Sequence, residues 1–277
     1  MKTKTRFLIY PLLLMGVLLM LTNSCKKEGD IFASIQFNPD LTYGTMTDID
    51  GNVYKTITIG TQTWMAENLK TTRYRNGDPI RNIADNSAGE NDTTGGYCNI
   101  LNNSNYTINF GRLYNWFAVN DSRNIAPEGW HVPTDVEWHI LMLHLDANAF
   151  LDTTAIQDPN DRKGNESFYE SQIAGYKLQE TGSNHWKADS RFFRSNGKFY
   201  DSGDNSKSTN ESGFTALPAG LLLINGSFAD LGENANLWSS TEYIDSCAWS
   251  RCIIGGLVLH IYDSKLGGFS VRCIKDN

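Results

Sequence analysis

Three strand-like runs near the C-terminal end of the chain, separated by glycine pairs, constrain its fold more than any other feature. The runs cover residues 248–254, 257–262 and 268–274, and Gly255-Gly256 and Gly267-Gly268 lie at the breaks between them. Glycine pairs between short apolar segments are typical of hairpin turns, because glycine adopts positive φ angles without steric cost. We therefore expect antiparallel strands joined by two tight hairpins.

A second group of strands is expected at residues 46–69. Asp50-Gly51 lies between two alternating runs, which is a tight-hairpin pattern, and Gly60-Thr61 marks a second turn. These residues predict a small antiparallel meander. Residues 76–109 are polar and rich in Asn and Gly, and they indicate a loop.

Two helices are expected between these regions. The first covers about residues 111–120. The second begins at Thr134, which is placed to form a capping box with Glu137. Its expected core face consists of aliphatic side chains: Ile140, Leu141, Leu143 and Leu145. Together with the strands, they predict an α+β domain of short antiparallel strands, two helices and long loops.

The first 24 residues are expected to be a secretory signal. Three basic residues precede an apolar run, residues 7–21, which is shorter than the roughly 20 residues of a membrane-spanning helix. The run ends in Leu21-Thr-Asn-Ser-Cys25, which resembles a bacterial lipobox. The resemblance implies that Cys25 is acylated and becomes the new N-terminus. An ordinary signal peptide with a nearby cysteine is the alternative.

Residues 25–44 lack periodicity and are expected to be a flexible tether in front of a domain at residues 45–277. Lys26-Lys-Glu-Gly-Asp30 resembles the surface-export tether of Bacteroidetes lipoproteins, which implies an outer-membrane lipoprotein exposed at the cell surface. Without the signal, 21 basic residues face 31 acidic ones, a net charge of −10. Nucleic acid is therefore disfavoured as a partner, because phosphate backbones attract basic patches.

Several blocks of sequence, taken in order, resemble the Fibrobacter succinogenes major paralogous domain. They occur at residues 60–70, 111–116, 126–138, 213–220, 237–242 and 268–276. The resemblance implies a fold related to C-type lectin-like domains and formylglycine-generating enzymes, and it brings no function with it. Most tryptophans of the domain lie inside these blocks, which favours a core role for them: Trp64, Trp116, Trp130, Trp138 and Trp238.

Four cysteines follow Cys25, namely Cys98, Cys247, Cys252 and Cys273, and they allow three disulfide pairings or free buried thiols. Formylglycine-generating oxidases carry a cysteine pair spaced like Cys247 and Cys252, which binds Cu(I) through two thiolates. The resemblance makes this pair a candidate catalytic site. However, the Arg-Gly-Gly-Ser block of those enzymes is absent, and in one strand two cysteines five apart point to opposite faces.

Oxygen-rich turns offer Ca²⁺ candidates at Asp201, Asp204 and Asn205, with Asn91-Asp92 as another; a solvated polar turn is the alternative. The Glu-Pro-Asn and Trp-Asn-Asp tripeptides of calcium-dependent lectins are absent, and so is a His-Glu-x-x-His zinc signature. His139 and His144 lie on different sides of the expected helix and are interpreted as surface or packing residues.

Trp249 lies outside the family blocks and shares a strand face with Cys247 and Arg251. With Glu242, Trp249 and Arg251 are the candidate ligand-binding residues. The leading hypothesis is a non-catalytic surface lipoprotein that needs no cofactor and presents a lectin-like domain to a glycan or an extracellular protein. The alternatives are a copper-thiolate oxidase and a purely structural envelope protein.

Overall fold

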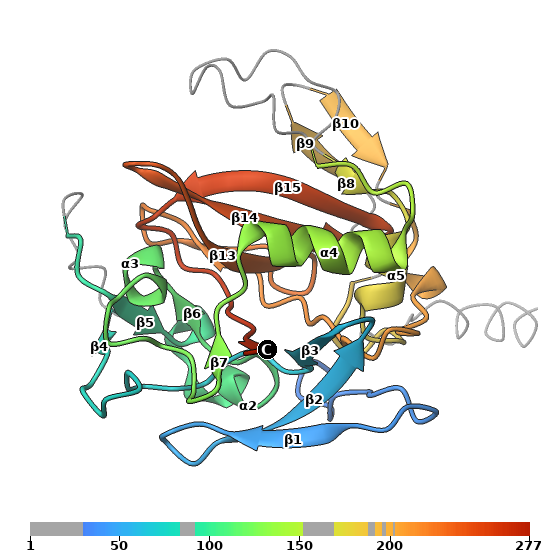
Figure 1. Ribbon diagram of the computed structural model, residues 1–277. Helices are drawn as coiled ribbons and strands as arrows, with labels where there is room; N and C mark the ends of the chain where they lie inside the picture. The colour runs from blue at the N-terminus through green and yellow to red at the C-terminus, as the bar shows by residue number, and fades with distance from the viewer. Residues whose placement is uncertain (1–29, 84–91, 152–168, 188–191, 196–197, 202) are drawn as a thin grey trace, which may run out of the picture.

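The computed structural model describes residues 30–83, 92–151, 169–187, 192–195, 198–201 and 203–277. In this part of the chain, the two largest sheets have five and four strands, and helix α4 (Asp135–Leu145) lies beside both (Figure 1). One sheet has five strands in the order β1-β2-β3-β16-β7, and the other has four in the order β13-β14-β15-β8. The expectation of an α+β fold with mostly antiparallel strands is confirmed. Among the described helices, none has the length and apolar character needed to cross a bilayer.

The five-stranded sheet contains the expected meander. β1 (Gly44–Thr47), β2 (Val53–Ile59) and β3 (Gln62–Met65) pair in antiparallel register. Gly51 takes a positive φ of 82° in the first turn, where the Asp48 carboxylate accepts the backbone N–H of Asp50 and Asn52. The sheet is completed by two short strands from distant parts of the chain: β7 (Trp130–His131) and β16 (Ile274–Lys275).

The four-stranded sheet confirms the first glycine hairpin. Its strands are β8 (Tyr169–Ser171), β13 (Ala235–Ile244), β14 (Cys247–Ile254) and β15 (Leu257–Ser264). The expected hairpin at Gly267-Gly268 is wrong, because the chain leaves this sheet after β15 and residues 268–270 make single bridges to Leu222, Tyr114 and Leu237. A Cβ on Gly268 would lie 2.9 Å from the Cβ of Leu222, so glycine is needed there for close backbone approach.

Helix α4 begins with the expected capping box. The Thr134 hydroxyl accepts the N–H of Glu137, and the Glu137 carboxylate accepts the N–H of Thr134. The expected core face is only half right, since Ile140 and Leu143 are exposed. The buried face has the i, i+3, i+4, i+7 spacing that starts at Trp138: Trp138, Leu141, Met142 and Leu145.

The region expected to be a loop and a long helix contains several short elements. The loop prediction is wrong at β4 (Arg81–Asn82), β5 (Gly96–Cys98), α2 (Thr107–Phe110) and the 3₁₀ turns η1 (Ile100–Asn102) and η2 (Ser104–Tyr106). Of the helix expected over residues 111–120, only α3 (Trp116–Val119) is helical. β6 (Leu113–Tyr114) precedes it, and the Asn115 side chain caps its first turn.

Other short elements connect α4 to β13. They are α5 (Ala174–Leu178), β9 (Phe192–Ser195), β10 (Lys198–Asp201), η4 (Asn205–Lys207), β11 (Leu221–Leu222) and β12 (Phe228–Ala229). β9 pairs with β10, and β11 pairs with β12, as separate antiparallel hairpins.

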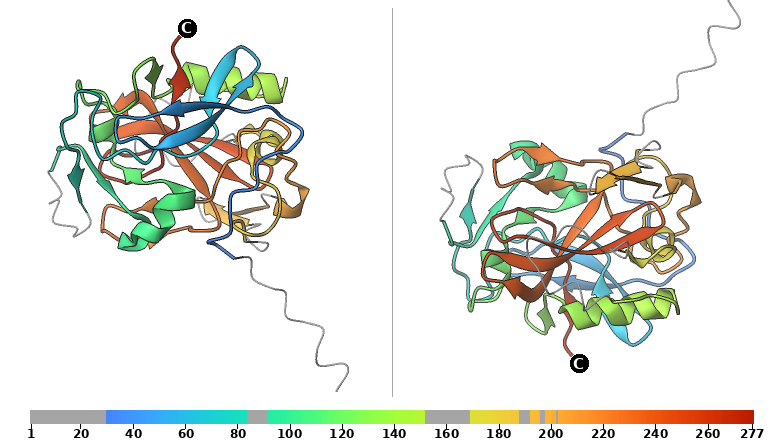
Figure 2. Two further views of the ribbon diagram at one scale, coloured as in Figure 1. Left: turned by 90° about the horizontal axis from the view of Figure 1, so that it is seen from below. Right: turned by 90° about the horizontal axis from the view of Figure 1, so that it is seen from above.

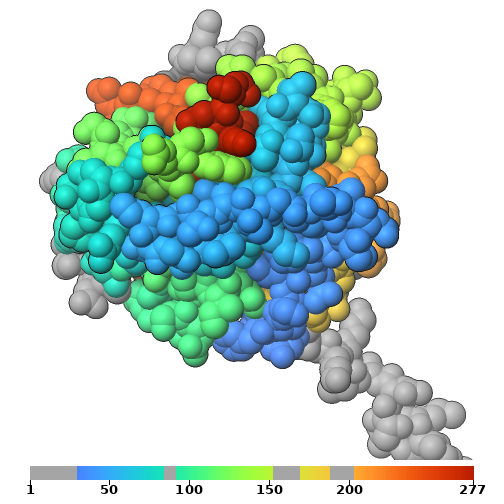
Figure 3. Space-filling model, turned by 60° about the horizontal axis from the view of Figure 1, so that its bottom comes forward, coloured from blue at the N-terminus to red at the C-terminus, as the bar shows by residue number. Residues whose placement is uncertain are grey.

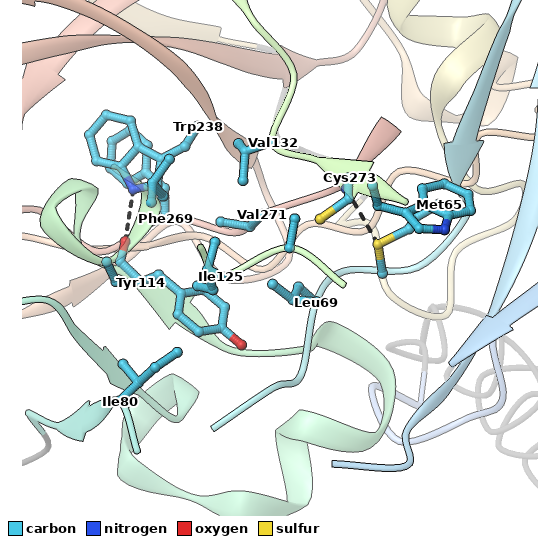
Figure 4. Close-up of a cluster of buried hydrophobic side chains, with 14 of the residues drawn as sticks. Met65, Leu69, Ile80, Tyr114, Ile125, Val132, Trp238, Phe269, Val271 and Cys273 are labelled. Carbon is cyan, nitrogen blue, oxygen red and sulfur yellow. Dashed lines mark hydrogen bonds between the residues drawn. The ribbon is translucent and has the colours of Figure 1, made fainter. Parts of the chain in front are cut away.

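Aromatic side chains fill the core, as the family blocks predict. In one cluster, Trp238 stacks on Phe269 with ring centroids 4.3 Å apart and donates to the Tyr114 carbonyl (Figure 4). In another, Trp64 and Trp138 pack against each other and against Phe214. The core role expected for five tryptophans is confirmed, since each is buried: Trp64, Trp116, Trp130, Trp138 and Trp238.

The N-terminal segment, residues 31–43, lies against the domain rather than extending away from it. Phe37, Leu41 and Tyr43 pack on one core cluster, and Ile31 and Ile35 pack on another. Figure 3 shows this segment in dark blue beside the green region that contains α2. The predicted flexible tether is therefore wrong for residues 31–43. Residues 25–29 and the signal sequence lie outside the described residues, and both remain predictions.

Candidate functional site

One face of the four-stranded sheet carries a group of charged side chains and, beside it, a cluster of aromatic side chains. Cross-strand register places Arg251 opposite His260 and Trp249 opposite Tyr262 on this face. Its inner end is apolar and lies in the core with α4, its middle is charged, and its outer end is aromatic. The predicted sharing of a face by Cys247, Trp249 and Arg251 is confirmed.

Arg251 is the centre of the charged part. Its side chain has no exposed surface, and it makes ion pairs with Glu170 through Nε and with Asp135 through Nη1 at 2.5 Å. Glu170 is equally buried. Burial of both partners requires this pairing, since an uncompensated charge in the interior is costly. Three separate elements, β8, β14 and the first turn of α4, are joined by one guanidinium.

Two histidines complete the charged group. The Nδ1 atom of His139 donates to Glu170 at 2.7 Å. The Nε2 atom of His260 lies 3.1 Å from Asp135 Oδ1, an ion-pair distance without the alignment of a hydrogen bond. The sequence indicates a surface or packing residue at His139. Its contact with the buried carboxylate of Glu170 depends on the fold and has no local sequence signal.

Protonation in this group follows from burial and charge. Burial opposes ionisation of Asp135, but His260 and Arg251 outweigh it and lower the pKa of Asp135 to about 2. Burial also disfavours the imidazolium of His260 and lowers its pKa, although Asp135 acts in the opposite direction. Asp135 is therefore ionised at neutral pH. Because Arg251 and Glu170 are fully enclosed, they offer no atom to an external substrate.

The aromatic end of the face is partly open to solvent. Trp249 stacks on His260 with ring centroids 4.0 Å apart and meets the edges of Tyr243 and Tyr262. The two tyrosines are half-buried and stack on each other at 4.3 Å. We call Tyr243, Trp249 and Tyr262 the aromatic surface. Register shifts in β13 on both sides of Glu242 accompany the arrival of Tyr243 on this face.

The three predicted ligand-binding residues do not form one site. The prediction that Arg251 binds a ligand is corrected, because its side chain is fully buried and forms structural ion pairs. Trp249 is 7% exposed and packs beneath Tyr243 and Tyr262, the two more exposed rings of the aromatic surface. Glu242 is exposed but lies opposite Ala248, on the other face of the sheet, where it pairs with Lys265.

Cys247 and Cys252 are not brought together. Both lie in β14 and both are free thiols, as are Cys98 and Cys273. Five residues of strand separate the two by roughly 16 Å, with the side chains on opposite faces. Burial raises the pKa of Cys252 well above its usual range, which disfavours the thiolate that Cu(I) requires.

The calcium candidates serve as turn residues. The Asp204 carboxylate accepts the N–H of Ser206, and the buried Asn205 amide donates to the Lys187 carbonyl. Asp92 pairs with Arg81. The side chain of Asp201 and residue Asn91 lie outside the described residues. Within the described ranges, no group of three or more His, Cys, Asp or Glu side chains is arranged to hold a metal ion.

Sequence reasoning missed the residues that surround Trp249 and Arg251: Asp135, Glu170, Tyr243, His260 and Tyr262. One signal was available, because Tyr262 and His260 occupy the strand after the Gly255-Gly256 hairpin and the register follows from a two-residue turn. No local pattern indicates Glu170, which lies 81 residues from Arg251.

Comparison with known proteins gives one match. The family model described as the Fibrobacter succinogenes major domain matches residues 57–275, most of the chain. Searches of curated proteins and of solved structures find nothing that matches. The matched range includes the four-stranded sheet, α4, the strands β3, β7 and β16 and the last three residues of β2. The chain belongs to the Fibrobacter succinogenes major domain family.

Proposed function

We propose that this chain is a surface-exposed outer-membrane lipoprotein whose lectin-like domain binds a glycan or an extracellular protein without catalysis. The observation that carries the binding proposal is the aromatic surface, in which half-buried Tyr243 and Tyr262 lie over a buried Trp249. Tyrosine and tryptophan offer large, rigid contact areas with a polar edge, and they dominate the energetics of many binding surfaces.

The charged group beneath the aromatic surface supports this role. The Trp249 ring rests on His260, and Asp135 and Arg251 lie next to His260 on the buried side. Because the Trp249 ring stacks on His260 and makes edge contacts with both tyrosines, the aromatic surface loses little rotamer freedom when a ligand arrives, and binding costs less conformational entropy. The separation of Cys247 and Cys252 favours binding over the copper-oxidase alternative.

The membrane address rests on Cys25 and the signal that precedes it. Cys25→Ser is expected to move the protein from the detergent phase to the aqueous phase in a Triton X-114 partition, and the protein should no longer incorporate labelled palmitate. A Cys25→Ser protein that stays in the detergent phase would contradict lipidation. Protease digestion of intact cells tests surface exposure, and full resistance would place the domain inside the envelope.

Binding is tested on a glycan array and an extracellular-matrix protein array with the domain in soluble form. For a ligand found there, Tyr262→Ala is expected to weaken binding at least tenfold, because it removes one of the two outer rings. Tyr97→Ala is the matched control, since Tyr97 is a half-buried tyrosine on the separate β4-β5-β6 sheet. Equal loss for both variants, or no ligand at all, would favour the structural envelope role instead.

A further inference from the structure

Five large apolar side chains are exposed around the point where the described chain begins. They are Phe32 at 54%, Leu101 at 47%, Ile108 at 71%, Leu223 at 42% and Ile224 at 70% of their surface. We call these five residues the anchor-side surface. They come from three segments: the N-terminal segment, the η1-η2-α2 region and the β11-β12 hairpin.

The three segments are neighbours. Ile31 and Ile35, Ile100 and Phe110, and Leu222 all contribute to one core cluster. Phe32 packs on Tyr106 with ring centroids 5.2 Å apart, and a shallow cavity of about 230 Å³ lies between Phe32 and Ile108. Figure 2 shows α2 and the orange β11-β12 hairpin on the side where the described chain begins. The three segments that carry the exposed residues therefore lie on one side of the molecule.

Two of the three segments carry no charge. Residues 99–110 and the β11-β12 hairpin, residues 221–229, contain no Lys, Arg, Asp or Glu, although 20% of the chain is charged. Exposed segments of a soluble surface normally carry charges that keep them hydrated. Their absence beside exposed Ile108 and Ile224 indicates a surface that meets an apolar medium.

Leu101 adds an independent observation. It has a positive φ of 51°, a conformation that is unfavourable for a branched aliphatic residue, and its side chain is directed into solvent. Such strain persists only where the surrounding structure enforces it, and it is concentrated at functional positions.

The length of chain outside the described residues identifies what covers this surface. Only four residues lie between Cys25 and Asp30, and the five residue steps from one to the other span about 18 Å at most in a fully extended chain. The N-terminal segment cannot lengthen this connection easily, because the Ala33 carbonyl accepts from Asn109 and from His185, which is itself paired with Glu180 in the interior.

We propose that the anchor-side surface rests on the lipid bilayer in which the acyl chains of Cys25 are embedded, with Phe32, Ile108 and Ile224 entering the interfacial layer. The inference depends on the proposed lipidation of Cys25. Apolar side chains bind a bilayer in proportion to the area they bury, so they add a second contact to the lipid anchor and fix the orientation of the domain. None of the five residues belongs to the aromatic surface, which stays open to external ligands.

The test uses the full lipidated protein in vesicles of phosphatidylethanolamine and phosphatidylglycerol. A nitroxide is attached at Ile108→Cys in a Cys247→Ser background, because Cys247 is the only described thiol that is not buried. The matched control is Ile140→Cys, on the exposed side of α4. Collision with oxygen, which concentrates in lipid, is compared with collision with a water-soluble nickel chelate.

The oxygen-to-nickel ratio at position 108 is expected to exceed the ratio at position 140 at least threefold. Equal ratios would overturn the inference, and so would protection of position 108 from both reagents, which would indicate a protein partner or a second copy. Failure of the protein to float with the vesicles would instead refute lipidation, so the two proposals fail separately.

A second measurement avoids the introduced cysteine. Amide hydrogen exchange in residues 99–110 is expected to slow at least tenfold when the lipidated protein binds vesicles. The triple variant Phe32→Ser, Ile108→Ser, Ile224→Ser should lose this protection, while the control Val136→Ser, Ile140→Ser, Leu143→Ser on α4 should keep it. Protection that is unchanged in the first variant would contradict lipid contact.

Discussion

Replacement of Arg251 by methionine is the most direct test of the charged group. Methionine keeps much of the length of the side chain and removes the charge, which leaves Glu170 and Asp135 in the interior without their shared cation. Removing one partner of a buried ion pair typically costs about 3–5 kcal/mol. Each carboxylate keeps a histidine neighbour, so we expect the lower end, about 3 kcal/mol.

The assay is urea denaturation at pH 7.5, followed by tryptophan fluorescence and analysed by linear extrapolation. The double variant Arg251→Met, Glu170→Gln should recover part of the loss, because it removes one uncompensated charge. Arg123→Met is the control, since Arg123 forms its ion pairs at the surface and should change the midpoint far less.

A loss below about 1 kcal/mol for Arg251→Met would refute the reasoning that the buried carboxylates depend on this guanidinium. The pH dependence provides a further check. Because the pKa of Asp135 falls from 3.8 to about 2 on folding, its stabilising contribution is complete above about pH 4 and is lost as the pH falls towards 2.

Three further variants test other parts of the structure. Burial raises the pKa of Asp263 from 3.8 to about 6, so the parent protein loses stability progressively as the pH rises between those values. The stability of Asp263→Asn relative to the parent should therefore increase by about 2 kcal/mol between pH 4 and pH 8. A difference in urea midpoints that stays constant with pH would contradict this. Thr134→Ala removes the capping hydroxyl of α4 and should cost about 1 kcal/mol in the same denaturation experiment, and no loss would mean that the cap contributes nothing. Gly220→Ala should cost more than about 1 kcal/mol, because φ is 65° and the new Cβ would lie 2.1 Å from the Ala229 carbonyl oxygen; a thermal midpoint equal to that of the parent would show that the backbone can move there.

The shorter tether limits how far the domain can stand from a membrane. A tether of about 20 residues allows a domain to stand clear of a bilayer. Residues 31–43 pack on two core clusters, which leaves at most residues 25–30 for a flexible tether. Sequence alone did not indicate this, because the contacts of Ala33 and Gln36 are with side chains more than 70 residues away.

By itself, the sequence determined those features of this protein that depend on residues a few positions apart. The Asp50-Gly51 turn, the Gly255-Gly256 hairpin and the Thr134–Glu137 capping box are of this kind, since φ preferences and caps act within one turn. The family blocks likewise identified the tryptophan core.

Only the tertiary structure decided the candidate site. Arg251 meets Asp135 across 116 residues and Glu170 across 81, and burial makes Arg251, a ligand-binding candidate by sequence, a structural ion-pair partner. It also decided that the last glycine pair serves close packing and that Cys247 and Cys252 point apart. Each of these outcomes depends on which distant segment approaches, and a local pattern carries no information about that.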